Sequence, residues 1–405
     1  MTATHSIRNY SIITGAYWGF TLTDGAIRML VVLYFHQLGY TPLAIASLFL
    51  FYEFFGVVTN LVGGWLGSRI GLNNTMQLGM LLQIAALLML TVPAEYLGVI
   101  YVMAAQALSG VAKDLNKMSA KASVKFLMPA TGDGRESSHR LFKLIAILTG
   151  SKNTLKGAGF FLGGLLLATL GFQDALFLLA ISLFFVFILV HFLLPKEIGK
   201  AKKKTTFTQI FSNSSAINWL SASRFFLFGS RDVWFVVGLP LFLSSTLGWS
   251  FEKVGSFLAL WIIGYGLIQA AAPKLIRKLH SGQGPDGRTA LIIVLMLLFV
   301  PSGIAFMLYR GYDAATVVIV GLSVFAIVFA INSALHSFLI VHWSDVDKVS
   351  MNVGFYYMAN ASGRLVGTIL SGLTYQYYDL LGCLILSALF VSMSVLTSVK
   401  LPREA

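Results

Sequence analysis

Charged side chains recur at helical spacing inside apolar stretches of this chain. Lys113 and Lys117 are four residues apart, and so are Lys152 and Lys156, which would place each pair on one face of a helix. Two lysines on one face repel each other, and an anion would relieve that repulsion while accepting their hydrogen bonds. The spacing therefore predicts anion binding, with phosphate, arsenate and carboxylate groups as candidates.

Twelve charged side chains fall within apolar stretches. The eight basic ones are Arg28, Lys113, Lys117, Lys152, Lys156, Arg224, Arg231 and Arg364, and the four acidic ones are Asp24, Glu53, Asp114 and Asp232. Each charge at the centre of a membrane helix costs about 3 kcal/mol, so we expect the set to face a shared aqueous cavity and partly to pair. The excess of four positive charges favours a small-molecule anion as substrate.

The acidic residues have two open roles. Asp24 lies four residues before Arg28 and is expected to pair with it. Asp114 and Asp232 adjoin basic residues and are expected to form similar charge pairs. Each acid is alternatively a carrier of a coupling proton, and Glu53, which has no basic residue at helical spacing, is the best single candidate for that role.

Seven further side chains complete the predicted substrate-binding set: Asn116, Asn153, Asn360, His336, Tyr17, Trp234 and Tyr356. For His336 and the aromatic residues, core packing is the competing interpretation. No catalytic residue, metal ligand or cofactor is predicted, because the chain has one cysteine, Cys383, and lacks a glycine loop for a nucleotide.

Long apolar helices must position these residues. Hydrophobic residues make up 57% of the 405-residue chain and charged ones 11%, and apolar runs of about 20 residues, long enough to cross a bilayer, recur along it. The sequence predicts an all-α integral membrane protein whose twelve transmembrane helices lie near 10–36, 42–67, 75–94, 97–123, 142–170, 173–194, 217–244, 252–275, 290–309, 314–341, 350–375 and 380–399. The fifth stretch carries glycines that predict a seam of close helix packing: Gly157, Gly159, Gly163 and Gly164.

The chain divides into two predicted six-helix bundles, residues 1–195 and 217–405, joined by a basic cytoplasmic linker at 196–216. Loop charges set the orientation, because 19 lysine and arginine residues fall on the side of both termini and two on the other. This asymmetry predicts a multi-pass membrane protein with both termini in the cytoplasm. We expect the membrane to be the bacterial inner membrane. The net charge of +13 then reflects membrane topology, and nucleic acid is not an expected partner.

The two halves repeat weakly in sequence. Leu38-Gly39-Tyr40 aligns without a gap with Leu247-Gly248-Trp249. Parallel halves of six helices are typical of the major facilitator fold, whose substrate site lies near the midplane between the halves. Gly64, Arg69 and Gly71 also match the loop motif of that superfamily after its second helix, although Ser68 stands where the motif has aspartate. We expect the charge-pair latch of this motif to be weaker here.

Four segments resemble the ArsJ-type organoarsenical efflux transporters: WGFTLTDGAIR from Trp18, SGVAKDLNKMSAK from Ser109, TGSKNTLKGAGFFLGG from Thr149 and SRDVWFVVGLPLF from Ser230. The resemblance covers nearly the whole chain. It implies export of 1-arseno-3-phosphoglycerate, arsenate resistance, and a functional link to a glyceraldehyde-3-phosphate dehydrogenase that makes the compound. We expect a monomer that works by alternating access.

Three alternatives stay open. An organophosphate/phosphate antiporter would also use basic residues on the first and seventh helices, here Arg28 and Arg231. A proton-coupled multidrug exporter fits less well, because such cavities are apolar with one or two acids. A transporter-like sensor or assembly factor is disfavoured by the absence of a sizeable soluble domain.

Overall fold

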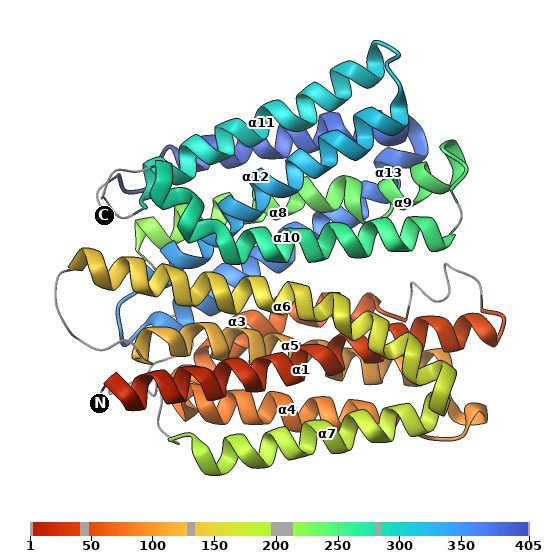
Figure 1. The fold of residues 1–405 in the computed structure, drawn as a ribbon, viewed down its shortest axis with the longest axis vertical. Coiled ribbons are helices and arrows are strands. Elements are labelled where there is room, and N and C mark those ends of the chain that lie inside the picture. Colours follow the sequence, from red (N-terminus) through yellow and green to blue (C-terminus); the bar gives the residue numbers. More distant parts are fainter. Residues whose placement is uncertain are drawn as a thin grey trace. The chain divides into compact units, whose positions relative to one another are not determined.

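The computed structural model describes residues 3–40, 48–127, 134–195, 214–249, 251–279 and 285–403. This part of the chain is helical throughout and contains no strand (Figure 1). The long helices are α1 (Ala3–Gln37), α3 (Leu50–Ile70), α4 (Leu72–Met89), α5 (Val99–Leu127), α6 (Gly134–Leu170), α7 (Phe172–Leu193), α8 (Ser215–Phe235), α10 (Phe251–Leu279), α11 (Gly287–Tyr309), α12 (Ala314–His342) and α13 (Val349–Ser398). Short elements are η1 (Ala94–Tyr96), α9 (Gly238–Leu241) and the π-helical turn η3 (Phe242–Thr246).

The helix α13 contains two of the predicted membrane helices. Asp379 within it has φ 54° and ψ −164°, which breaks the helical path close to the predicted boundary between residues 375 and 380. Counted in this way, the long helices of the described part correspond one to one with the twelve predicted stretches. The prediction of an all-α, twelve-helix fold is confirmed. Helix α6 begins at Gly134, ahead of the apolar stretch predicted from 142, because polar residues extend it.

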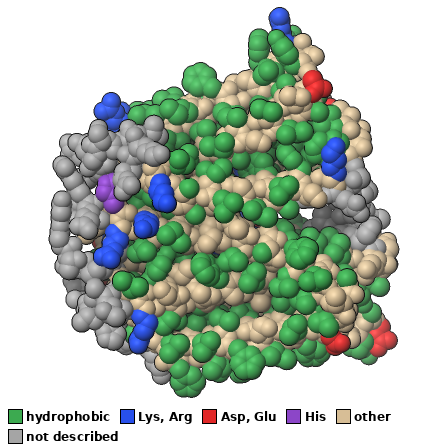
Figure 2. All heavy atoms as spheres, in the orientation of Figure 1, with side chains coloured by type: hydrophobic (Ala, Val, Ile, Leu, Met, Phe, Trp, Pro, Cys, Tyr) green, Lys and Arg blue, Asp and Glu red, His purple; other side chains and the backbone are tan. Residues whose placement is uncertain are grey.

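Hydrophobic side chains cover the outer surface of these helices. Phe185, Phe192 and Ile100 are among the exposed large apolar residues, as expected for helices that face lipid. Figure 2 shows such side chains over the middle of the helices, with the visible Lys and Arg side chains toward the helix ends. In the described part, six helices are apolar and long enough to cross a membrane by length and composition alone. Helices such as α5 and α8 are less apolar because they carry the charged residues of the candidate site.

The chain forms two compact units. The first comprises Met1–Gly132, Ser151–Ser212 and Ser344–Met358, and the second comprises Asp133–Gly150, Asn213–Trp343 and Ala359–Ala405. Helix α6 is therefore divided between the units after Gly150, and α13 after Met358. Most of the predicted linker 196–216 lies outside the described residues, which resume at 214.

Glycines bring the helices of the first unit into close contact. A Cβ at Gly159 of α6 would lie 2.7 Å from Leu22 O of α1, and one at Gly163 would lie 2.5 Å from Ala26 O. The predicted packing seam is thus present at these two positions. A Cβ at Gly110 of α5 would lie 2.6 Å from Tyr52 O of α3. The glycine therefore also allows α3 and α5 to pack closely. These contacts set the separation of the helices that carry the charged residues.

The second unit has an aromatic core. Trp234 of α8 packs edge-on against Trp261 of α10 and Phe325 of α12, with ring centroids 5.8 Å and 5.1 Å away. Helices α11 and α12 run side by side, and α12 also packs on α10 (Figure 1). The repeat proposed from sequence has a structural counterpart, because Gly39 and Gly248 both have positive φ, at 83° and 65°. A residue with a side chain is disfavoured in this conformation, which explains why the turn keeps glycine in both halves.

Candidate functional site

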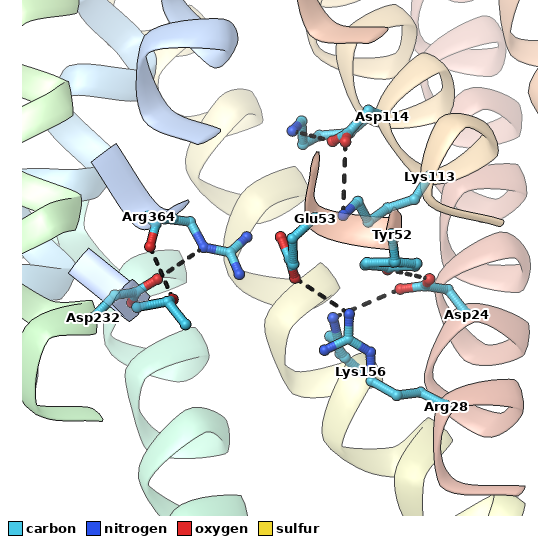
Figure 3. Close-up of polar contacts among 11 residues, drawn as sticks. Asp24, Arg28, Tyr52, Glu53, Lys113, Asp114, Lys156, Asp232 and Arg364 are labelled. Carbon is cyan, nitrogen blue, oxygen red and sulfur yellow. Dashed lines mark hydrogen bonds and ion pairs between the residues drawn. The ribbon is translucent and has the colours of Figure 1, made fainter. Parts of the chain in front are cut away.

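Tyr52 of α3 lies at the centre of the charged residues of the first unit. Its hydroxyl donates a 2.6 Å hydrogen bond to the Asp24 carboxylate of α1. Its ring centroid lies 3.8 Å from Lys113 Nζ and 4.4 Å from Arg28 Cζ. Residues of α1, α3 and α5 therefore meet on one aromatic ring (Figure 3).

Asp24 and Arg28 each have a partner on another helix. Asp24 Oδ2 lies 3.7 Å from Lys156 Nζ of α6, and Arg28 Nη2 lies 3.4 Å from Glu53 Oε1 of α3. Spacing along α1 predicts a pair between Asp24 and Arg28 but gives no sign of these partners, because they come from neighbouring helices. Glu53 is the best candidate for a proton carrier from sequence because its own helix has no basic residue at helical spacing. In the structure it has a basic partner, Arg28, on the neighbouring helix.

Asp114 is the shared counterion of two lysines on α5. Its carboxylate lies 2.5 Å from Lys117 Nζ and 3.6 Å from Lys113 Nζ. Gly56 of α3 leaves room for it, since a Cβ there would lie 2.8 Å from Asp114 Oδ2. The sequence indicates that Asp114 neutralises one adjacent lysine, and the structure shows that it contacts both.

Lys152 of α6 has a different environment. Within the described residues no carboxylate lies at ion-pair distance from it. The charges that act on it are those of Lys156, Lys117 and Lys113, together with the carboxylate of Asp24. We call the five basic residues predicted for this region the first cation cluster: Arg28, Lys113, Lys117, Lys152 and Lys156. Three carboxylates accompany these five cations: Asp24, Glu53 and Asp114.

Two further residues of this region were not identified from sequence. Lys121 is one of the 19 residues counted on the cytoplasmic side, although it lies inside the predicted stretch 97–123. In the structure α5 continues to Leu127, and Lys121 is only 3% exposed. Tyr357 of α13 has its ring centroid 4.3 Å from Lys117 Nζ and 5.4 Å from Lys121 Nζ. The repeat of lysine every four residues from Lys113 was the available signal for Lys121, whereas nothing in sequence separates Tyr357 from other aromatic residues.

The second unit contains a carboxylate between two arginines. Asp232 of α8 is fully buried and lies 2.5 Å from Arg231 Nη2 and 3.1 Å from Arg364 Nε of α13. Figure 3 shows the contact of Asp232 with Arg364. The predicted pairing of Asp232 with its neighbour Arg231 is present, and Arg364 is an additional partner.

Arg224 is held by neutral groups. Its Nε donates to Asn360 Oδ1 at 2.8 Å, and its Nη1 donates to the backbone and side-chain oxygens of Ser333 at 3.2 and 3.1 Å. The Phe228 ring lies 3.9 Å from Arg224 Cζ and 5.0 Å from Arg231 Cζ. Asn360, predicted to contact substrate, therefore orients Arg224 in this conformation. We call the three basic residues of this region, Arg224, Arg231 and Arg364, the second cation cluster.

The remaining predicted residues are mostly buried. Asn116 donates to Met76 O of α4 at 3.1 Å and thus joins two helices. Trp234 belongs to the aromatic core, as its competing interpretation proposes. His336 is fully buried, and its ring nitrogens have no hydrogen-bond partner within the described residues. The other three residues, like Asn116, belong to the first unit: Tyr17 and Tyr356, which are buried, and Asn153, which is partly exposed.

At one end of α5, outside the predicted membrane stretch, Lys125 contacts the segment before α13. Its amino group donates to Ser344 O. Burial lowers the pKa of Lys125, and Asp345 opposes that effect. The loop motif lies at the junction of α3 and α4, where Gly71 has φ 90° between the two helices and Arg69 lies over the Trp65 ring.

Comparison with known proteins identifies the family to which the chain belongs. The sequence pattern of the Major Facilitator Superfamily matches residues 13–339. No curated protein matches the chain significantly. The described residues contain no group of three or more histidine, cysteine, aspartate or glutamate side chains that would hold a metal ion.

Several solved structures share the fold. A bacterial homologue of the iron transporter ferroportin in an outward-facing state is 16% identical, with a TM-score of 0.75 over 96% of this chain and 98% of that chain. The human organic anion transporter MFSD10 (TETRAN) is 16% identical, with a TM-score of 0.73 over 97% and 99%. The proton:xylose symporter XylE is 13% identical, with a TM-score of 0.73 over 98% and 95%.

The chain belongs to the major facilitator superfamily. It is a multi-pass membrane transporter and not an enzyme. At these identities the solved structures establish the fold alone, so the substrate must be argued from the residues of this chain.

Proposed function

We propose that the chain exports an anionic organoarsenical, with 1-arseno-3-phosphoglycerate as the substrate that the resemblance to the ArsJ-type transporters implies. The first cation cluster carries this proposal: five basic side chains within transmembrane helices are accompanied by three carboxylates. An anion would balance the remaining charge and accept hydrogen bonds in a medium where unpaired charge is costly.

Lys152 is the residue that most directly supports an anionic substrate. A lysine among other lysines, with no carboxylate at ion-pair distance in the described part of the chain, is unfavourable unless an anion binds beside it. The second cation cluster supports the same substrate class, because Asp232 contacts two of its three arginines, Arg231 and Arg364. Arg224 is hydrogen-bonded to the neutral side chain of Asn360. An apolar cavity with a single acid, typical of multidrug exporters, does not fit either unit.

Export of an anion is favoured by the membrane potential. With the cell interior negative, each negative charge moved outward through 100 mV gains about 2.3 kcal/mol. The proposed substrate has a phosphate ester at one end and an acyl arsenate group at the other, and it carries several negative charges at neutral pH. We therefore propose alternating access driven by substrate gradient and potential, in the bacterial inner membrane with both termini cytoplasmic, without an obligatory proton-carrying residue.

Uptake into inverted membrane vesicles tests the substrate. Vesicles containing the chain should accumulate the product that glyceraldehyde-3-phosphate dehydrogenase forms from arsenate, and should take up 3-phosphoglycerate, phosphate and arsenate more slowly. Lys117→Ala should abolish uptake while the protein remains folded in the membrane. Exchange of organophosphate for phosphate with no organoarsenical uptake would instead establish the antiporter, and unchanged uptake in Arg28→Ala, Lys117→Ala, Lys152→Ala and Arg231→Ala would reject the site.

A further inference from the structure

The Tyr52 ring lies between two cations of the first cation cluster. Lys113 Nζ and Arg28 Cζ lie 3.8 Å and 4.4 Å from its centroid. Figure 3 shows the ring edge-on, with Lys113 on one side and Arg28 on the other. Both cations are within the range in which the negative face of an aromatic ring attracts them.

The orientation of the ring is fixed at two points. The hydroxyl donates to Asp24 at 2.6 Å, and Asp24 also lies 3.7 Å from Lys156. The backbone of Tyr52 packs on Gly110, where a Cβ would lie 2.6 Å from Tyr52 O. Tyr52 is only 1% exposed, so neither the ring nor its main chain has room to move aside.

Each of the two cations also contacts a carboxylate near the ring. Arg28 lies 3.4 Å from Glu53, and Lys113 lies 3.6 Å from Asp114. The ring therefore separates two cation–carboxylate pairs. While it stays in place, Arg28 and Lys113 are kept from converging on the oxygens of one compact anion.

We propose that Tyr52 is a positioning residue that determines specificity by holding Arg28 and Lys113 apart as two separate binding points. This arrangement suits an elongated anion with two charged groups and disfavours a compact anion with one centre, such as inorganic phosphate. The inference rests on the proposed function, which supplies the anionic substrate, and goes beyond it by naming the residue that rejects small anions.

Replacement of the ring tests this role through selectivity. The probes are 3-phosphoglycerate, which has two charged groups, and inorganic phosphate, and the measurement is the concentration dependence of thermal stabilisation of the purified full-length protein. Tyr52→Leu should reduce the preference for 3-phosphoglycerate over phosphate by about tenfold, because the two cations can then converge. Tyr52→Phe keeps the ring and should retain most of the preference. Phe172→Leu, which removes an aromatic ring stacked on Tyr34 at 4.0 Å, is the matched control and should lower stability without changing the preference.

The outcomes are separable. An unchanged preference in Tyr52→Leu, or the same loss in Tyr52→Phe as in Tyr52→Leu, overturns the role of the ring while leaving organoarsenical uptake by the wild type intact. Absence of stabilisation by either probe in a wild type that also fails to take up the organoarsenical overturns the proposed function, and this inference with it.

Discussion

Arg364 Nε of α13 donates a 3.1 Å hydrogen bond to Asp232 Oδ2 of α8, and this bond makes Asp232 a counterion for two arginines. Asp232→Asn should leave Arg231 and Arg364 facing each other without a negative charge. We expect a loss of about 2 kcal/mol in stability, since removing one member of a buried charge pair leaves the others uncompensated. Thermal denaturation in detergent measures the loss, and added 3-phosphoglycerate should restore more stability to the variant than to the wild type. An equal response of both proteins would show that the arginines do not bind this anion.

Lys152 and Lys156 are four residues apart on α6, yet their replacement should have opposite effects on stability. Lys152→Met removes a cation that lies among cations, so the ligand-free protein should be as stable as the wild type or more stable. Lys156→Met removes the cation 3.7 Å from the buried Asp24 and should lower stability. Both variants should lose organoarsenical uptake. The melting temperature in detergent distinguishes them, and a clear loss in Lys152→Met would mean that its charge is compensated after all.

The seam between α1 and α6 predicts a steric effect. Gly159→Val should destabilise the first unit by about 1–3 kcal/mol, because even the Cβ would lie 2.7 Å from Leu22 O. Gly164→Ala is the matched control, since the nearest atom to its Cβ would be Leu33 Cδ1 at an ordinary 3.7 Å. Fluorescence-detected size-exclusion chromatography after heating should show early aggregation only for Gly159→Val. Similar behaviour of both variants would argue against close packing at Gly159.

The fold could be predicted from sequence because helix length and hydrophobicity follow directly from the bilayer. Charged positions inside the apolar stretches were equally visible, since they break a simple pattern. The partners of these charged residues on other helices could not be predicted. Glu53 contacts Arg28, and Lys156 contacts Asp24, across helix interfaces that the spacing along one helix does not specify. Tyr52 is a buried aromatic residue like many others here, and only packing shows that it contacts two cations.

Asp313 gives α12 a pH-dependent N-terminus. Its carboxylate accepts a 2.8 Å hydrogen bond from Thr316 N, and hydrogen bonding with the side chain and backbone of Thr316 lowers the pKa of Asp313 below 3.8. A lowered pKa in the folded state adds stability that is present above the unfolded value and is lost as pH falls through the folded value. Asp313→Asn keeps an acceptor but does not titrate, so the variant should lose less stability than the wild type on acidification below pH 3.8. Identical acid denaturation curves would contradict this prediction.

The first part of α13 packs within the first unit at a pair of glycines. A Cβ at Gly354 would lie 2.6 Å from Asn60 O of α3, and the Ser350 hydroxyl donates to Gly64 O at 2.7 Å. The loop motif on α3 has Ser68 in place of its aspartate. The contacts of Gly354 and Ser350 that hold α13 against α3 are likewise uncharged.

If α13 leaves this position during transport, Gly354→Val should favour its departure, because the side chain cannot fit against α3. Replacement of the single native cysteine by Cys383→Ser allows a reporter at Ser350→Cys, which is 2% exposed in this conformation. A membrane-permeant maleimide should label residue 350 faster when Gly354→Val is present. A cysteine at Ser371, also buried but in the second unit, is the control and should keep its labelling rate. Unchanged labelling at 350 would show that α13 keeps its contact with α3 even when the glycine pair is filled.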